Sequence, residues 1–159
     1  MKAEQSEFIK QIYLEMYDML LDYAYSSLQN RQQAEEAVQE AFQIACQKPK
    51  ELMNSPNPQG WMTITVKNTV RNTLHRQKRD SRLLAAFLAT QSAQLAVTED
   101  RISMEIHYGD MVHLEEYKLL EDMVLKGKSQ LEMAEERGIS LVACKKRVQR
   151  AKETLKKML

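Results

Sequence analysis

The chain has 159 residues with a formal net charge of +1, so its length allows one domain or two small ones, and its overall charge argues against nucleic-acid binding. Its two cysteines, Cys46 and Cys144, are far apart and lack a CxxC motif or a nearby histidine pair, so we expect reduced thiols, no metal and no cofactor. No apolar run approaches the ~20 residues of a membrane span and the N-terminus is no signal peptide, which predicts a cytoplasmic protein without membrane insertion.

Helical periodicity dominates the first part of the chain. A first helix is expected from about Glu4 to Leu28, and a second from its N-cap Asn30 to about Gln47, with Gln33 at the capping-box position. The broad apolar face predicted for the first helix comprises Ile9, Ile12, Tyr13, Met16, Met19, Leu20, Tyr23 and Ala24. The buried stripe predicted for the second comprises Ala34, Val38, Ala41, Phe42 and Ala45.

All three prolines fall in the predicted loop Lys48–Gln59, and Pro58 is placed to occupy the first position of a third helix. Apolar residues recur on one side of that helix, at Met62, Val66, Val70 and Leu74. Basic residues recur on a neighbouring side, at Lys67, Arg71, His75 and Lys78. The pattern predicts a helix that is apolar on one face and strongly basic on another.

The pattern weakens after Arg82, and a flexible linker is expected within residues 84–110. The predicted fold is all-α, with two small helical domains (residues 1–83 and 111–159) on either side of this linker. Apolar residues early in the second domain are expected to pack onto its C-terminal part; they are Leu114, Leu119, Leu120, Met123 and Val124.

The segment Ser129–Leu159 has the layout of a helix-turn-helix. Ala134 lies in a short first helix, Gly138 opens a turn, Ile139 packs between the helices, and Ser140 stands at the N-cap of a basic second helix. In such a motif the second helix enters the DNA major groove. We therefore expect a DNA-binding C-terminal domain.

Charge counted by segment removes the objection raised by the net charge. Residues 61–82 hold six Lys or Arg and one Asp, and residues 143–159 hold seven Lys or Arg and one Glu. Residues 1–60 and 83–142 are net acidic and mask both basic blocks. Each block can neutralise several phosphates, although a solvated helix face is the alternative interpretation of each.

Three motifs together resemble the sigma-70 family of bacterial RNA polymerase sigma factors, specifically the small two-domain extracytoplasmic-function type. The sequence AEEAVQEAF, at residues 34–42, is similar to region 2.2 of that family. Residues 60–79 resemble regions 2.3 and 2.4, and residues 129–155 resemble region 4.2. The resemblance implies a non-enzymatic initiation subunit that binds core RNA polymerase and promoter DNA, commonly under the control of an anti-sigma factor.

The resemblance also implies residue roles. Binding to core polymerase is expected from Glu36, Gln39, Glu40 and Phe42. Contacts to the single-stranded −10 element are expected from Lys67, Asn68, Arg71, Asn72 and Arg76, with an extruded base held by the loop Lys48–Gln59. Contacts to the duplex −35 element are expected from Ser140, Lys145, Lys146, Arg147 and Arg150.

Some features of the sequence leave choices open. Trp61 suits either core packing or a stacking platform for a base, and packing is favoured because it lies beside the buried stripe. Ala143 and Cys144 replace the small polar and aliphatic residues often found at these family positions, so the −35 preference cannot be carried over. Apolar residues that would hold the recognition helix remain, at Val142, Cys144 and Val148.

Two other functional classes compete with a sigma factor. A free-standing helix-turn-helix regulator would bind duplex operators, usually as a dimer, but would not need the polar face at residues 36–40 or the proline-rich loop. A protein-interaction adaptor would gain nothing from six cations at residues 61–82. An enzyme is not expected, because no paired catalytic carboxylates, activated nucleophile or glycine-rich phosphate loop is found.

Overall fold

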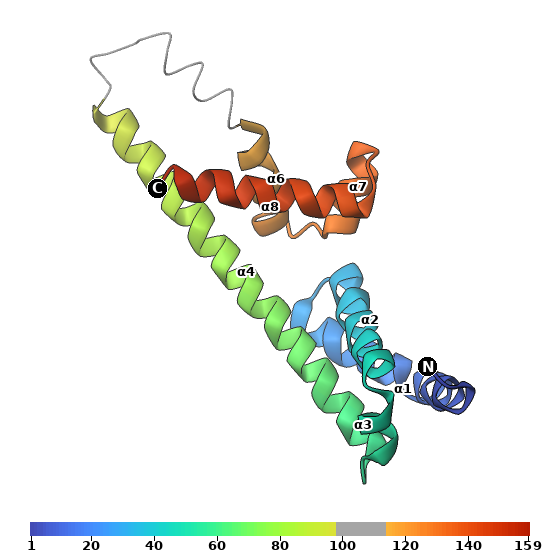
Figure 1. The fold of residues 1–159 in the computed structure, drawn as a ribbon. Coiled ribbons are helices and arrows are strands. Elements are labelled where there is room, and N and C mark those ends of the chain that lie inside the picture. Colours follow the sequence, from blue (N-terminus) through green and yellow to red (C-terminus); the bar gives the residue numbers. More distant parts are fainter. Residues whose placement is uncertain (98–113) are drawn as a thin grey trace. The chain divides into compact units, whose positions relative to one another are not determined.

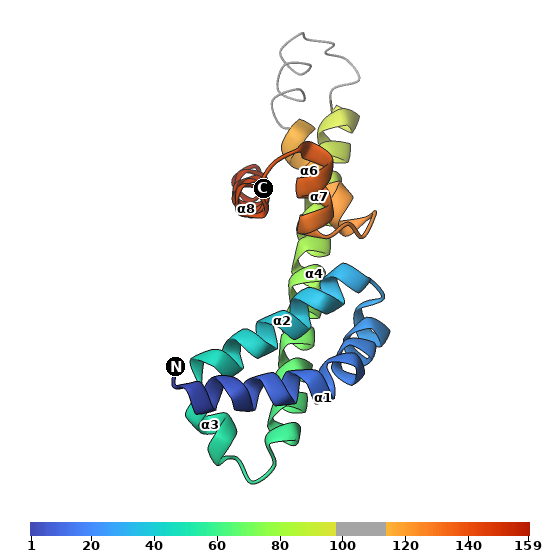
Figure 2. The same ribbon diagram turned by 90° about the vertical axis from the view of Figure 1, so that its right-hand side faces the viewer.

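The computed structural model describes residues 1–97 and 114–159, with side chains described for residues 1–90 and 115–159. This part of the chain contains helices and no strand, which confirms the all-α prediction (Figures 1 and 2). The helices are α1 (Ala3–Leu28), α2 (Arg31–Gln47), α3 (Pro49–Asn54), α4 (Pro58–Val97), α6 (Leu114–Val124), α7 (Gln130–Arg137) and α8 (Leu141–Lys157).

The chain divides into two compact units, Met1–His75 and Arg76–Leu159. The division falls inside α4, which continues to Val97. Residues 84–97, where the sequence predicted the beginning of the linker, are therefore helical. The rest of the predicted linker, residues 98–110, lies outside the described residues. The predicted domain limits stay a prediction, and each unit is described below by itself.

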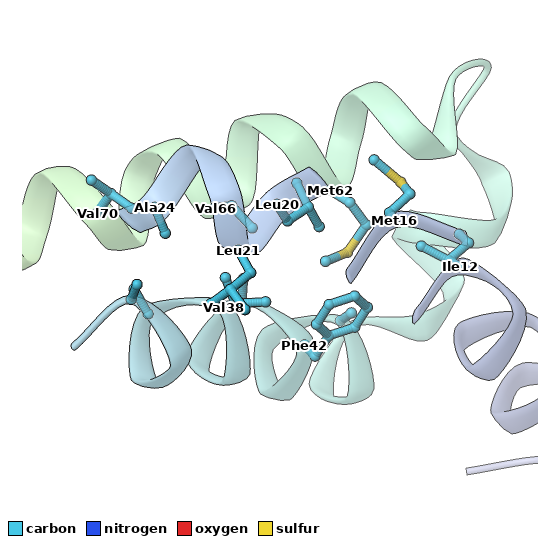
Figure 3. Close-up of a cluster of buried hydrophobic side chains, with 14 of the residues drawn as sticks. Ile12, Met16, Leu20, Leu21, Ala24, Val38, Phe42, Met62, Val66 and Val70 are labelled. Atoms are coloured by element: carbon cyan, nitrogen blue, oxygen red, sulfur yellow. The ribbon is translucent and has the colours of Figure 1, made fainter. Parts of the chain in front are cut away.

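The core of the first unit forms where α1, α2 and α4 meet. Met16, Leu20 and Ala24 of α1 lie level with apolar residues of α4, so the two helices run in the same direction (Figure 3). The α4 residues are Met62, Val66 and Val70. Four alanines face this core from α2 and allow a close approach of the helices; they are Ala34, Ala37, Ala41 and Ala45. The stripes predicted for α2 and α4 are confirmed, with Leu74 only partly buried.

The face predicted for α1 was too broad. Its Tyr13, Met19 and Tyr23 are exposed, by 40%, 57% and 38%, while the narrower row of aliphatic residues is buried. An apolar stripe of that width would need a neighbour on both flanks. In the first unit α2 and α4 cover only the central stripe, so the flanking aromatic rings remain at the surface.

Side-chain caps set the ends of the helices in this unit. Asn30 Oδ1 accepts from the Gln33 backbone N–H at 3.0 Å, as predicted, and Asn57 Oδ1 accepts from the Gly60 N–H at 3.1 Å at the start of α4. A Cβ added to Gly60 would lie 2.5 Å from Asn57 Nδ2, so a larger residue there would force the capping amide of Asn57 to move. The start of α4 at Pro58 agrees with the sequence.

Helix α3 was not predicted, because the sequence indicated a loop at these residues. Pro49 occupies the first turn of this six-residue helix, where its missing N–H costs nothing. Leu52 is fully buried in the core of the first unit and fixes the helix in place. The segment 48–57 is therefore a short anchored helix followed by a turn.

In the second unit, α6, α7 and α8 surround a small core of their own. Leu119 of α6 packs with buried residues of α7 and α8, which are Met133, Ala134, Cys144, Val148 and Ala151. Ser129 and Ser140 cap α7 and α8 by accepting from backbone N–H groups, each at 3.1 Å. Gly138 ends α7 in the left-handed conformation with φ +64°, which glycine adopts without strain.

The C-terminal part of α4 also belongs to the second unit. Leu84 and Phe87 of α4 are buried in one cluster with Leu120 of α6 and Leu155 of α8. Lys152 of α8 forms an ion pair with Asp80 of α4, at 2.9 Å between Nζ and Oδ1. The helix that carries the basic face of the first unit thus also completes the core of the second.

Candidate nucleic-acid and polymerase interfaces

The outward face of α4 in the first unit is continuous, polar and basic. Exposed residues follow one another at helical spacings of three and four, at Ile64, Lys67, Asn68, Arg71, Asn72 and His75. The opposite side of α4 is fixed by the core and by buried Thr69, whose Oγ1 donates to the Ala37 carbonyl oxygen at 2.9 Å. This arrangement brings together four of the five residues predicted for −10 binding. The fifth, Arg76, is exposed on α4 but falls in the second unit.

An aromatic ring that the sequence assigned to the core adjoins this α4 face. The Nζ of Lys67 lies 6.0 Å from the centroid of the Tyr23 ring on α1. At that distance the ammonium group is attracted to the ring face. Tyr23 thus extends the surface with a flat apolar group next to a cation. No motif marks Tyr23 in the sequence, and only the register of α1 against α4 places it there.

The outward face of α2 carries the residues predicted to bind polymerase, with one exception. Gln39 is exposed, and Glu36 and Glu40 are half-buried on the same side of the helix. Phe42 is instead buried, at 8% exposure, and its ring meets the Tyr13 ring edge-on with centroids 5.0 Å apart. A partner at this surface would therefore meet Tyr13, with Phe42 supporting it from beneath.

Tyr13 of α1 adjoins the outward face of α2, and the sequence had not assigned it to partner binding. Its ring lies 4.8 Å from that of Tyr17, which is partly buried between α1 and α2. Burial, and then the neighbouring Tyr13 and Glu35, raise the pKa of the Tyr17 hydroxyl. The phenol therefore stays neutral at physiological pH, and the edge between α1 and α2 offers aromatic surface beside acidic groups.

Trp61 lies near the start of α4 and packs, partly buried, against the core of the first unit. This placement favours the core-packing interpretation over a stacking platform. Cys46, on α2, is exposed, and no disulfide joins it to Cys144. The proline-rich segment predicted to hold a base contains α3, whose Leu52 points into the core.

On α8 the predicted −35 residues point in several directions. The side chains of Lys145, Lys146, Arg147 and Arg150 are all exposed. Ser140 Oγ is engaged as the helix cap. Arg147 and Arg150 face α6 and line an open cleft of about 450 Å³ together with Glu115 and Glu116. Arg147 and Arg150 thus lie on the side of α8 that faces α6, whereas Lys146 is exposed on another side of the helix.

Val142 corrects one expectation for α8. The sequence suggested that it helps to hold the recognition helix, but it is 63% exposed, whereas Cys144 and Val148 are buried as predicted. Burial raises the pKa of the Cys144 thiol, so this cysteine is a neutral core residue. Val142 therefore belongs to the outer surface of α8, beside its cations.

Polar contacts hold α7 against α6 and so position α8. Arg137 of α7 donates to Asp122 of α6 at 3.1 Å, and Lys126 pairs with the same carboxylate at 3.1 Å. Burial raises the pKa of Asp122, but the hydrogen bonds from Lys126 and Arg137 outweigh it and leave the pKa below the ordinary value of 3.8. The carboxylate is thus ionised at neutral pH and joins the two helices that precede α8.

Within residues 1–97 and 114–159, no three His, Cys, Asp or Glu side chains gather into a group that suits a metal ion. In the same ranges no helix combines the length and hydropathy that a bilayer-spanning segment needs. The exposed candidate faces of α4 and α8 are rich in Lys, Arg, Asn and Gln. Such faces suit the recognition of phosphates and base edges.

An all-helical protein with two basic helix faces has the features of a nucleic-acid-binding protein. Residues 12–80 match the sequence model of sigma-70 region 2. The match supports a sigma-70 family member with a role in transcription initiation, since region 2 binds core RNA polymerase and the promoter −10 element. It includes every residue predicted for those two contacts. No curated protein and no solved structure matches the chain.

Proposed function

We propose that the protein is a dissociable sigma factor of the small two-domain extracytoplasmic-function type. It would bind core RNA polymerase, direct it to promoters through the −10 and −35 elements, and help to melt the DNA. One observation carries the proposal. The segment that matches sigma-70 region 2 ends in α4, whose exposed face combines Lys67 and Arg71 with Asn68 and Asn72.

The residue types on α4 suit a melted strand. Cations attract the phosphate backbone, asparagine amides pair with base edges that become accessible on strand separation, and an aromatic ring beside them accepts a stacked base. Lys67 and Arg71 supply the charge, Asn68 and Asn72 supply the amides, and Tyr23 supplies the ring. In this proposal the segment Lys48–Gln59 holds an extruded base.

Polymerase binding is assigned to the outward face of α2. Gln39, Glu40 and the nearby Tyr13 offer amide, acidic and aromatic groups. Tyrosine is enriched in protein interfaces, and acidic groups complement a basic patch on a partner. Glu36 lies on the same side of α2. Phe42 contributes by supporting Tyr13 from within the core.

Duplex −35 recognition is assigned to the second unit, where α7, a turn with Gly138 and α8 follow the order of a helix-turn-helix. The backbone N–H groups at the start of α8, near Ser140, suit a DNA phosphate. The protein would act where the polymerase is, in the cytoplasm, without a cofactor and without catalytic chemistry of its own. An anti-sigma partner would hold it inactive.

The test is run-off transcription with purified core bacterial RNA polymerase on a pool of promoters, with and without the protein. Specific start sites that require the protein are the expected result. Absence of such transcripts, together with failure to co-sediment with core polymerase, would instead favour a free-standing helix-turn-helix regulator that binds duplex operators.

A double variant examines the polymerase interface in the same assay. Replacement of Gln39 and Glu40 by lysine reverses the charge of the outward face of α2 and is expected to abolish co-sedimentation with core polymerase and all dependent transcripts. The matched control, Gln11→Lys with Glu15→Lys, makes the same charge change at exposed positions of α1. Retained binding by the α2 variant would show that the interface lies elsewhere.

A further inference from the structure

Helix α8 carries two rows of residues with the same spacing and opposite environments. The inner row is buried in the second unit and comprises Cys144, Val148, Ala151 and Leu155. The outer row lies two residues earlier along the helix and comprises Val142, Lys146, Gln149 and Glu153, all exposed. A two-residue offset turns a helix by about 200°, so the outer row faces directly away from the scaffold.

The outer row combines groups that distinguish base pairs. An exposed valine offers a methyl surface that suits the C5-methyl of thymine, and a glutamine amide suits the N6 and N7 atoms of adenine. Lysine suits the O6 and N7 atoms of guanine or a phosphate. Val142 exposes 63% of its surface at the start of α8, where a recognition helix meets base edges.

Glu153 explains how Gln149 is held. Gln149 Nε2 donates to Glu153 Oε1 at 3.3 Å, one helical turn further along α8. This bond uses one amide hydrogen and leaves the second hydrogen and the carbonyl oxygen, the pair of groups that adenine requires. Glu153 is also the only acidic residue among residues 143–159, and an acid on a phosphate-binding face weakens attraction to DNA.

We infer that Val142 and Gln149 are the residues that determine the −35 base preference, with Val142 selecting thymine and Gln149 selecting adenine. Glu153 acts as a positioning residue for Gln149. This inference rests on the proposed function, because it requires that α8 lies in the major groove. Arg147 and Arg150, which face the α6 cleft, then contribute charge and not base discrimination.

The spacing along α8 fixes where the two bases should lie. Val142 and Gln149 are seven residues apart, which is about 10.5 Å along the helix. Base pairs rise by about 3.4 Å per strand step, so a helix that follows the groove places the two contacts about three base pairs apart. The preferred −35 element is therefore expected to contain thymine and adenine at about that separation.

The experiment uses holoenzyme assembled from the full chain and core bacterial polymerase. Promoters with randomised bases around position −35 are transcribed, and the templates of the transcripts are sequenced. Gln149→Ala is expected to reduce the adenine preference about five- to tenfold at one position and leave the other positions unchanged. Val142→Ala is expected to reduce the thymine preference about threefold. Replacement of that thymine by uracil, which lacks the methyl group, should lower promoter use by the wild-type holoenzyme about threefold and leave promoter use by the Val142→Ala holoenzyme unchanged.

Glu153→Ala distinguishes positioning from a purely structural role. Loss of the negative charge is expected to raise total promoter binding, while loss of the orienting contact lowers the adenine preference at the Gln149 position. The control Lys156→Ala removes an exposed cation at the C-terminal end of α8, beyond the base-reading residues, and should lower binding to all sequences equally. A Glu153→Ala protein that binds more tightly with unchanged adenine preference would contradict the positioning role.

The outcomes separate this inference from the proposed function. Protein-dependent transcripts whose −35 preferences are the same in wild type, Gln149→Ala and Val142→Ala would overturn the inference and leave the sigma-factor proposal standing. Complete absence of protein-dependent transcripts with wild type would overturn the proposed function, and this inference with it. Base-specific loss in each variant, at positions about three base pairs apart, is the supporting result.

Discussion

The basic faces of α4 and α8 have similar charge but different composition. On α4 the two asparagines lie beside Lys67 and Arg71, and a tyrosine from α1 adjoins them. On α8 the outer row begins with an exposed valine, Val142, and includes Gln149, whose amide is held by Glu153. Stacking surface suits unpaired bases, whereas a methyl contact and an oriented amide suit base edges in a duplex groove. In the proposed function, the cations would attract DNA to both faces, and their uncharged neighbours would distinguish single strand from duplex.

The two faces also differ in what supports them. The α4 face is backed by the large core of α1, α2 and α3, whereas the α8 face depends on two small clusters that α6, α7 and the C-terminal part of α4 complete. An equal loss of buried contacts should therefore weaken duplex binding by the α8 face more than single-strand binding by the α4 face. Four predictions examine this comparison.

Removal of a buried side chain under α8 is expected to have the largest effect on stability. Leu155 is fully buried with Leu84 and Leu120, so Leu155→Ala should cost the second unit about 2–4 kcal/mol. Amide hydrogen exchange checks this, because the protection of α8 amides should fall by the same free energy while the protection of α2 amides is unchanged. Leu159→Ala, at an exposed position, is the control. Equal loss in both helices would show that the two units unfold as one.

Charge reversal on α4 is expected to separate the two faces most clearly in binding. Lys67→Glu with Arg71→Glu should weaken binding to a single-stranded −10 oligonucleotide about 100-fold and reduce its salt dependence by about 1.4 log units per log salt. Affinity for duplex −35 DNA should change little. Fluorescence anisotropy at several salt concentrations measures both affinities. Lys2→Glu at the N-cap of α1, with Lys10→Glu on α1, is the charge-matched control. Equal losses for strand and duplex would contradict the division of work.

Much of the helical framework was predictable because local signals determine where helices begin and end. Asn30, Pro58, Ser129 and Ser140 have short-range chemistry that favours a helix start, and each does begin a helix in the structure. Helix α3 escaped because six residues are too few for a periodic pattern and its proline suggested a loop. Its anchor, Leu52, depends on a core that the local sequence does not reveal.

The orientation of side chains was less predictable, because the rotation of a helix depends on its neighbours. Both Val142 and Cys144 are apolar enough to face a core, and only packing against α6 and α7 shows that Cys144 does so. The same rotation directs Arg147 toward the acidic residues of α6 and brings Gln149 outward. A basic helix could thus be identified from its sequence, but its reading face could not.

The aromatic neighbour of the α4 face permits a smaller and more specific test. Base stacking on an aromatic ring contributes about 1–3 kcal/mol, so Tyr23→Leu should weaken single-strand binding about five- to tenfold. Tyr23→Phe keeps the ring and should have little effect. Tyr25→Leu, at another exposed tyrosine of α1, should have none. A loss with Tyr23→Phe as large as with Tyr23→Leu would mean that the hydroxyl, and not the ring, makes the contact.

The smallest expected effect concerns the support of α8, and it depends on pH. Hydrogen bonds from Lys126 and Arg137 leave the pKa of Asp122 below its ordinary value of 3.8, despite the opposing effect of burial. Because the folded pKa is the lower one, this stabilisation is complete above the ordinary pKa and is lost as the pH falls through the folded pKa. Asp122→Asn should therefore cost the second unit about 1 kcal/mol at pH 7 and progressively less below about pH 4.

Hydrogen exchange of α8 amides at pH 7, and thermal unfolding from pH 7 down to about 3, measure this cost. Glu136→Gln is the control, since its ion pair with Lys128 is more exposed and should contribute almost nothing. A constant difference between wild type and Asp122→Asn at every pH would contradict the ionic origin of the effect. A difference that disappears in acid, without any change in the exchange of α2 amides, would show that the α8 face rests on a charge-dependent support that the α4 face lacks.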